Sequence, residues 1–334
     1  MKIRFGLAAF IEEGYSVAVV GSLSALGSWN PDGSLPLHPV IPPKAKEPSF
    51  WTCDVDLFGE GLPERFQYKF VRHGPAGRGI DEKGEGDIVP QWEWEGCGEG
   101  HNRTWEYQQD NIQGGVHCNP VARWQDKAGE TSEFDLTTRF FFYLSDNQLF
   151  HYSEILDNVW LGSCPRTAQH ITKDMKQVMG TTAVMNFQMD YDLLNNSADC
   201  CPPASDVPRY IYEIYRHYGI SYVWMPTVDM STEGRIKLLP QAVYVLHGLL
   251  RSGHNVYVHC NAGIGRSVAV VCGYLMYVLG WSFRKMQYYV CSRRPVSYID
   301  EVALKAAEKD FAAKFGRLPV EYRTRSERHS AAVI

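Results

Sequence analysis

The stretch that decides the fold reads His259-Cys260-Asn261-Ala262-Gly263-Ile264-Gly265-Arg266-Ser267. An apolar, β-branched run at 256–258 precedes it, and apolar residues at helical spacing follow it at 268–279. This order of patterns predicts a buried strand, a short loop with two glycines, and then the N-terminus of a helix. Such a junction binds anions, because free backbone N–H groups and the positive end of the helix dipole meet there.

Two more strand-like runs lie upstream, at 182–187 and 222–225. Apolar residues at helical spacing fill 239–250, between the second run and the strand before Cys260, and Gly253 ends that pattern. A strand, a helix and a strand in succession predict a parallel sheet with covering helices. We therefore expect an α/β domain with a mainly parallel central sheet over 151–316, followed by a charged, frayed tail at 317–334.

The first 125 residues follow a different pattern. They hold six of the nine tryptophans, and short alternating runs at 16–20, 51–57 and 66–71 are separated by turn residues. This pattern predicts an all-β sandwich over 1–125. Residues 126–150 form the connection, in which a last strand fits at 140–144.

Net charge and cysteine content indicate which partners and which cellular compartment to expect. A net charge of -5 argues against a nucleic-acid or membrane partner held by a basic face, and the sequence has no run long enough for a membrane span. Neither a signal peptide nor a Cys-x-x-Cys pair is present, so the nine cysteines favour a reducing, cytoplasmic compartment. The adjacent pair Cys200-Cys201 receives no role.

The residue types in the loop suit transfer of a phosphoryl group. Gly263 and Gly265 allow backbone N–H groups to turn inward around phosphate oxygens, and the same N–H groups favour a Cys260 thiolate. Arg266 can grip two phosphoryl oxygens with its planar fork, and Ser267 can donate a hydrogen bond to the departing sulfur. The simpler alternative for Cys260 is an inert buried thiol.

A departing alkoxide needs a proton, and Asp229 is the best candidate donor. It follows the run at 222–225, and parallel strands end at the same sheet edge, so its loop is expected to face the Cys260 loop. The same carboxyl group can then activate the water that hydrolyses the cysteinyl-phosphate. Cys164 is either a plain loop cysteine or a second thiol that protects Cys260 from overoxidation.

The His-Cys-x5-Arg-Ser loop, Asp229 and their order resemble the protein tyrosine and dual-specificity phosphatase family, over about 150–315. The resemblance implies no metal and no other cofactor. No residue between Cys260 and Arg266 is basic, whereas phosphoinositide phosphatases of this family place lysines there, so a highly phosphorylated inositol is disfavoured.

The first half resembles starch-binding carbohydrate-binding modules, in which tryptophans stack on glucose rings while polar side chains bind the hydroxyls. The resemblance implies a glucan site that comprises Trp29, Lys69, Trp94 and the loop Gly98-Glu99-Gly100-His101-Asn102. The simpler alternative is that the tryptophans fill a small core, which is the reading we favour for Trp51.

The two resemblances together point to the glycogen phosphatases, and they imply that Asp192 and Tyr298 also contact glucan at the catalytic mouth. For these two, a solvated loop acid and a half-buried tyrosine are the simpler alternatives. Gln67 stands where that family has a tryptophan, and the tail lacks that family's near-terminal cysteine, which removes a tail disulfide but leaves a noncovalent homodimer open.

Three functions remain open at this stage. The leading one is a cytoplasmic, glycogen-associated phosphatase that binds α-glucan and removes its phosphate monoesters. The others are a protein Ser/Thr/Tyr phosphatase targeted to glycogen, and a glycogen-bound scaffold. By resemblance the protein partners are a ubiquitin ligase of the malin type and glycogen-targeting phosphatase subunits.

Overall fold

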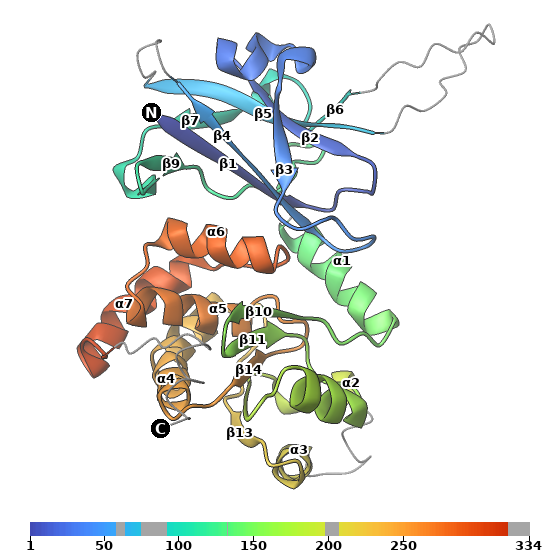
Figure 1. Ribbon diagram of the computed structural model, residues 1–334, viewed down its shortest axis with the longest axis vertical. Helices are drawn as coiled ribbons and strands as arrows, with labels where there is room; N and C mark the ends of the chain where they lie inside the picture. Colours follow the sequence, from blue (N-terminus) through green and yellow to red (C-terminus); the bar gives the residue numbers. More distant parts are fainter. Residues whose placement is uncertain (58–63, 75–91, 132, 198–206, 320–334) are drawn as a thin grey trace, which may run out of the picture. The chain divides into compact units, whose positions relative to one another are not determined.

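The computed structural model describes residues 1–57, 64–74, 92–131, 133–197 and 207–319 (Figure 1). Contacts between Cα atoms divide the chain into two compact units, Met1–Phe140 and Phe141–Ile334. The expected frayed tail lies mostly outside the described residues, as does the pair Cys200-Cys201. Within the described part of the chain, no helix combines the length and the apolar character that crossing a membrane requires.

The first unit is built from strands. In chain order these are β1 (Lys2–Ala9), β2 (Ser16–Gly21), β3 (Leu35–Pro39), β4 (Ser49–Asp56), β5 (Arg65–His73), β6 (Trp92–Trp94), β7 (Arg103–Glu106), β8 (Ile112–Gln113) and β9 (Val116–Cys118). They pair in the order β6-β5-β2-β3-β4-β1-β9-β8, with β7 also on β5, and every pairing is antiparallel except that of β1 with β9. The β-rich module expected from the alternating runs is confirmed.

Alternation along the strands places the core on one side of this sheet. Phe5 of β1, Val19 of β2 and Phe70 of β5 belong to one buried cluster, and their chain neighbours point the other way. Trp51 of β4 is buried in the same cluster, as expected, and its indole N–H donates to Ser49 Oγ at 2.8 Å. Trp105 of β7 stacks on Phe66 with ring centroids 4.9 Å apart.

The strand expected at 140–144 is wrong, because helix α1 (Glu133–Asp146) occupies this segment. The run Phe140-Phe141-Phe142-Tyr143-Leu144 is rich in residues that favour strands. The buried residues, however, are Leu136, Phe140 and Leu144, which recur every fourth position and so share one face of a helix. Phe142 is exposed, as helical spacing requires.

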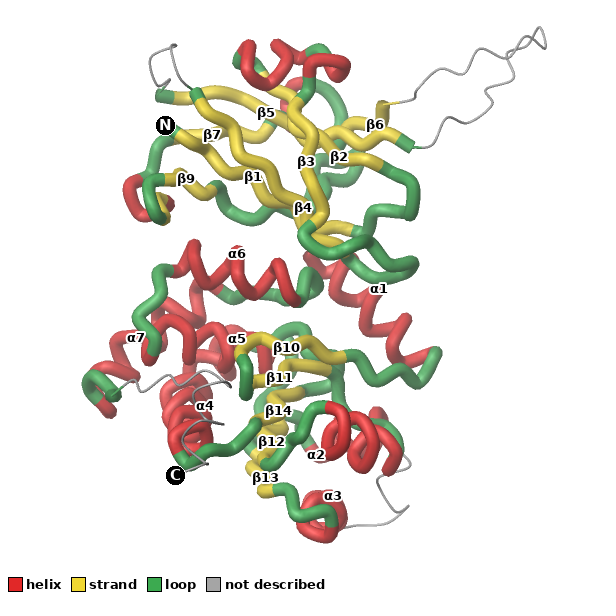
Figure 2. The backbone as a smooth tube through the Cα atoms, viewed as in Figure 1, coloured by secondary structure: helices red, strands yellow, loops and turns green. Residues whose placement is uncertain are grey.

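The second unit contains the predicted parallel sheet. Its strands are β10 (Tyr152–Leu156), β11 (Val159–Gly162), β12 (Ala183–Asn186), β13 (Ser221–Trp224) and β14 (Val256–His259), in the spatial order β10-β11-β14-β12-β13. Only β10 runs antiparallel to its neighbour. The expected mainly parallel sheet with flanking helices is confirmed (Figure 2).

Helices cover both faces of this sheet. Alternate residues of each strand face opposite sides, so Met185 and Val258 join one buried cluster while Val184 and Tyr257 join another. The first cluster takes side chains from α4 (Thr232–Arg251), α5 (Arg266–Gly273), α6 (Phe283–Arg293) and α7 (Glu301–Phe315). The second takes them from the π-helical segment His170–Val178, from α2 (Asp190–Asn196) and from α3 (Val207–His217).

The parallel strands bring distant loops to one edge. Cys164 N, after β11, donates to Asn261 O at 2.9 Å, and Phe187 N, after β12, donates to His259 O at 3.0 Å. Thr227 N, after β13, donates to Phe187 O at 3.3 Å. Four loops that are far apart in sequence therefore meet around the end of β14, where Cys260 lies.

Candidate active site

The loop from Cys260 to Gly265 joins β14 to α5 and turns at Gly263. Gly263 has a φ of +66°, and a Cβ atom there would lie 2.3 Å from the carbonyl oxygen of Gly162, so this position needs glycine for two reasons. Gly265 differs from the expectation, because its φ of -117° is open to any residue and a Cβ atom there would meet nothing closer than 3.8 Å.

The carbonyl groups of this loop are bound from outside. Asn261 O accepts from Cys164 N at 2.9 Å, and Ile264 O accepts from Tyr298 N at 2.8 Å. Between them, Arg294 donates to Ala262 O at 2.7 Å and to Gly263 O at 2.6 Å. Because the C=O and N–H of a trans peptide point in opposite directions, the N–H groups of residues 262–265 point to the inside of the loop. The loop is thus a preformed nest for an oxyanion.

Cys260 lies 3% exposed, in surroundings that favour its thiolate. Burial raises the pKa of the Cys260 thiol, but the charge of Arg266 and the hydrogen bonds from Ser267 outweigh burial, so the pKa falls below its ordinary value of 9.0. The Ser267 hydroxyl donates to Cys260 Sγ at 3.3 Å. Burial lowers the pKa of the preceding His259 to about 4, which leaves that imidazole neutral at pH 7.

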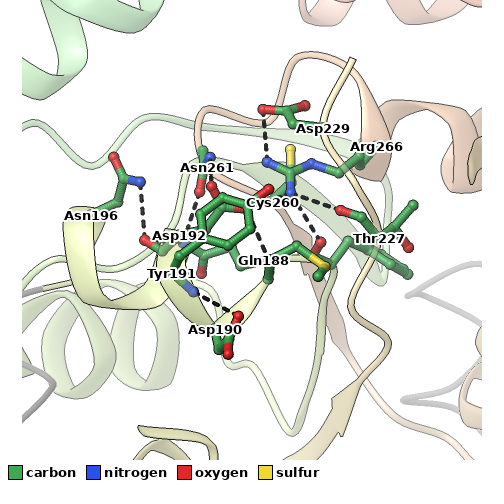
Figure 3. Close-up of polar contacts among 12 residues, drawn as sticks. Gln188, Asp190, Tyr191, Asp192, Asn196, Thr227, Asp229, Cys260, Asn261 and Arg266 are labelled. Carbon is green, nitrogen blue, oxygen red and sulfur yellow. Dashed lines mark hydrogen bonds and ion pairs between the residues drawn. The ribbon is translucent and has the colours of Figure 1, made fainter. Parts of the chain in front are cut away.

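Arg266 is fully buried, and one of its terminal nitrogens is held firmly (Figure 3). Nη1 donates to Asp192 Oδ2 at 2.6 Å, to Thr227 O at 3.0 Å and to Phe187 O at 3.3 Å. Nη2 forms an ion pair with Asp229 Oδ2 at 2.9 Å, and Nε has no hydrogen-bond partner among the described residues. The edge formed by Nε and Nη2 is therefore the one that can take a phosphoryl group.

Asp229 lies in the loop between β13 and α4, and the structure brings it to the phosphate loop as the parallel crossover predicted. Its side chain is 47% exposed, and Oδ1 accepts a hydrogen bond from Met230 N at 3.0 Å while Oδ2 pairs with Arg266. Met230 has a φ of +55°, the left-handed region that is uncommon for a residue with a side chain. The carboxyl group thus stands at the solvent side of the buried arginine.

Asp192 does not lie in a loop, and it is not solvated. It belongs to α2 and its side chain is 8% exposed. Oδ1 accepts from Asn261 Nδ2 at 2.8 Å, while Oδ2 accepts from Met189 N at 3.0 Å and from Arg266. Both carboxylate oxygens are engaged with the catalytic loop and its arginine, so this geometry supports a positioning role; contact with glucan stays a prediction.

Tyr298 lies beyond α6 and is half-buried, which agrees with its simpler alternative. The guanidinium of Arg235 lies 5.2 Å from the centre of its ring. Its backbone N–H binds the phosphate loop at Ile264 O, so Tyr298 adjoins the site. Its contact with glucan stays a prediction.

Cys164 is fully buried beneath the phosphate loop. Its thiol donates to Asn196 O at 3.6 Å, and burial raises its pKa to about 11, so it remains protonated at neutral pH. This is the environment of a structural cysteine, and protection of Cys260 stays a prediction.

Arg294 and Gln188 also belong to the site, although nothing in the sequence singles them out. Arg294 is fully buried and binds the loop carbonyls from 31 residues away, while Gln188 Nε2 donates to Asn261 Oδ1 at 2.9 Å. An arginine at a helix end before Pro295 resembles any surface cation in the sequence, so no local pattern could reveal its role.

The other residues expected to bind glucan, Trp29, Lys69, Trp94 and the loop at 98–102, lie on the first unit. Trp29 and Trp94 are part-buried and pack, with Trp92, on a small cluster of Ala18, Val20 and Val71, outside the main core. Lys69 is buried, and its ammonium donates to Glu95 O at 3.2 Å. Within the loop at 98–102, Asn102 Nδ2 donates to Gln67 Oε1 at 3.2 Å. Gln67, which stands where the family has a tryptophan, thus binds Asn102, one of the residues expected to contact the sugar.

Comparisons with known proteins cover both units. Residues 1–113 match the family model described as Starch binding domain, and residues 159–302 match Dual specificity phosphatase, catalytic domain. The chain is 43% identical to laforin of Mus musculus, over 95% of this chain and 98% of that protein. It is 29% identical to Phosphoglucan phosphatase LSF1, chloroplastic, of Arabidopsis thaliana, over 37% of this chain and 19% of that protein. The solved structure of PTPMT1 is 22% identical, covers 49% of this chain and 98% of its own, and has a TM-score of 0.39.

The catalytic match contains Cys260, Arg266 and Asp229, and the chain is accordingly a phosphatase of the dual-specificity type. The starch-binding match contains the tryptophans of the first unit. A phosphatase domain that follows a starch-binding domain, with 43% identity along nearly the whole chain, leads to one assignment. The chain belongs to the laforin family.

Proposed function

We propose that this protein binds α-glucan through its first unit and hydrolyses phosphate monoesters on that glucan through its second. The observation that carries the proposal is the convergence of Cys260, Arg266 and Asp229 on one oxyanion nest, in a chain that also matches a starch-binding domain. The relative named as a phosphoglucan phosphatase supports the same substrate class. A neutral loop between Cys260 and Arg266 suits a polymer without other charges.

In this proposal the reaction has two steps. Cys260 Sγ attacks phosphorus as a thiolate, the P–O bond to the sugar breaks, and protonated Asp229 gives its proton to the departing oxygen. Arg266 and the inward N–H groups of residues 262–265 stabilise the charge on the phosphoryl oxygens. Asp229, now a carboxylate, takes a proton from the water that attacks the cysteinyl-phosphate, and Ser267 stabilises the thiolate that leaves.

In this proposal Trp29, Lys69, Trp94 and residues 98–102 bind glucan on the first unit. Asp192 and Tyr298 contact glucan separately, at the catalytic mouth of the second unit. Association with glycogen in the cytoplasm belongs to the proposal, as do a noncovalent homodimer, a ubiquitin-ligase partner and glycogen-targeting phosphatase subunits. The likeness to laforin motivates these partners. Co-precipitation with and without glucan tests them.

Substrate choice decides between a glucan phosphatase and a protein phosphatase. Phosphate release from phosphorylated amylopectin is compared with release from phosphopeptides for the unaltered protein, Trp29→Ala and the control Tyr107→Ala, an exposed aromatic residue outside the proposed site. We expect faster release from amylopectin, and a loss confined to amylopectin in Trp29→Ala. Equal rates on both substrates, unaffected by Trp29→Ala, would contradict the proposal.

A further inference from the structure

A buried ion pair connects the start of α4 with the start of α7. Arg235 and Asp300 are 3% and 4% exposed, and Asp300 Oδ2 lies 2.8 Å from Arg235 Nε and 2.6 Å from its Nη2. The hydroxyl of Thr232 donates to the same oxygen at 2.8 Å. The other oxygen, Oδ1, accepts from Ala303 N at 3.0 Å and so caps α7. Each oxygen of this carboxylate therefore has a structural partner.

One end of this pair leads to the phosphate loop. Asp300 follows Tyr298 by two residues, and Tyr298 N donates to Ile264 O within the loop. The Arg235 guanidinium lies over the Tyr298 ring, and Arg235 Nη1 is the nearest atom to a Cβ built on Gly265, at 3.8 Å. The arginine is thus packed against the segment that holds the loop.

The other end leads to Asp229. Arg235 lies in the first turns of α4, whose cap Ser231 accepts from Gly234 N at 2.9 Å and follows Asp229 by two residues. Upstream, Thr227 N is bound to Phe187 O. The exposed carboxyl group therefore lies on a short loop that is fixed on both sides, by Phe187 before it and by the Arg235–Asp300 pair after it.

We propose that Arg235 is a positioning residue, which with Asp300 fixes the loop of Asp229 relative to the phosphate loop so that the proton reaches the departing oxygen. The inference rests on the proposed role of Asp229 as the acid. It is tested on the step in which the P–O bond breaks, which kcat/KM reports, because hydrolysis of the cysteinyl-phosphate comes after the alcohol has left and is the same for every substrate. The thiolate of Cys260 is stabilised by Arg266 and Ser267, which Arg235 does not contact in any described hydrogen bond or ion pair.

Two substrates separate this role from a general loss of structure. An alkyl phosphate releases a strongly basic oxygen that needs the proton, whereas p-nitrophenyl phosphate releases a weakly basic phenoxide that needs it little. We expect Arg235→Met and Asp300→Asn in the full chain to lower kcat/KM on the alkyl ester about tenfold more than on the aryl ester, a part of the 10²–10⁴-fold acceleration that general acids supply. The pH dependence of Cys260 alkylation by iodoacetamide should not change. Lys237→Met, which breaks an exposed ion pair with Glu233 on the same helix, is the control.

The Asp229→Ala background completes the test. There, Arg235→Met should cause no further loss on the alkyl ester, because the proton donor is already gone. Equal losses on both esters, or a full further loss without Asp229, would overturn the inference. If Arg235→Met does not fold, Thr232→Val removes one hydrogen bond to Asp300 and should give the same selectivity on a smaller scale. An Asp229→Ala variant that hydrolyses alkyl esters normally would instead refute the acid role itself.

Discussion

The hydroxyl of Ser267 is the one side-chain hydroxyl that donates to Cys260 Sγ among the described residues, and its removal has a measurable consequence. Hydrogen bonds to charged groups contribute about 1.5–3 kcal/mol. Ser267→Ala should therefore raise the pKa of Cys260, because the thiolate loses a hydrogen bond that stabilises its charge. Because the thiolate reacts, the pH below which alkylation and turnover fail should move upward. An unshifted alkylation profile would show that Arg266 and the backbone suffice.

Asp192 should affect both stability and catalysis. Both of its oxygens accept hydrogen bonds, so Asp192→Asn must turn its NH2 group toward Arg266 and Met189 N or toward Asn261, each of which is a donor. We expect a loss of about 1–3 kcal/mol in the free energy of unfolding, the usual result of an unmet buried hydrogen bond. A lower kcat should accompany it. Asp190→Asn, exposed at the start of the same helix, should change neither by a comparable amount, as denaturant titration and steady-state kinetics can show.

Short sequence motifs predicted the residues that act on phosphate, but they did not predict the residues that position those side chains. Cys260, Arg266 and Ser267 share one short motif, and Asp229 followed from the parallel crossover. Arg266 meets Asp192 across 74 positions, and Arg235 meets Asp300 across 65. Such pairs depend on how β12, α4 and α7 are arranged, and a single sequence carries no local signal of that arrangement.

At the scale of elements, the turn at Gly263 requires glycine. Gly263→Ala would place its methyl group against the Gly162 backbone in a left-handed conformation, so the loop must shift. A displacement of about 1 Å in a catalytic group costs about 10²-fold in rate, and we expect at least that loss in kcat. Gly248→Ala in α4, where a Cβ meets nothing within 4 Å, should instead stabilise the protein by about 0.5–1 kcal/mol. Equal behaviour of the two variants in activity and melting assays would contradict this account.

Helix α1 shows why element type was harder to predict than the sheet. The strands of the second unit are bounded by turns and rich in β-branched residues, so composition and periodicity agree. In α1 they conflict, because five aromatic and apolar residues follow one another while burial repeats every fourth position. Packing of one helical face favours the helix over the strand. In the sequence, this face becomes visible only when Leu136 is included with Phe140 and Leu144.

At the scale of the whole molecule, the starch-binding match and the phosphatase match fall in separate compact units. The double variant Trp29→Ala, Trp94→Ala should therefore lose retention on amylopectin by about tenfold or more, since 1.4 kcal/mol is a factor of ten and a stacked aromatic contributes about that much. Its kcat/KM on p-nitrophenyl phosphate should be unchanged. A matching loss of aryl phosphatase activity would mean that the two activities are not separable, and affinity electrophoresis beside a colorimetric assay measures both.

The carbonyl groups of residues 261–264 each accept a hydrogen bond from another part of the second unit. These bonds lower the free energy that the reaction must spend on orienting the loop. A bound phosphoryl group meets backbone dipoles that are already turned toward it, so the backbone of the loop need not rearrange. An unreactive phosphate mimic such as tungstate should protect the N–H groups of residues 262–265 from hydrogen exchange by direct contact. Hydrogen exchange in the segments that hold the loop should change little. The cost in free energy of orienting these dipoles is therefore met when the chain folds, before any substrate binds.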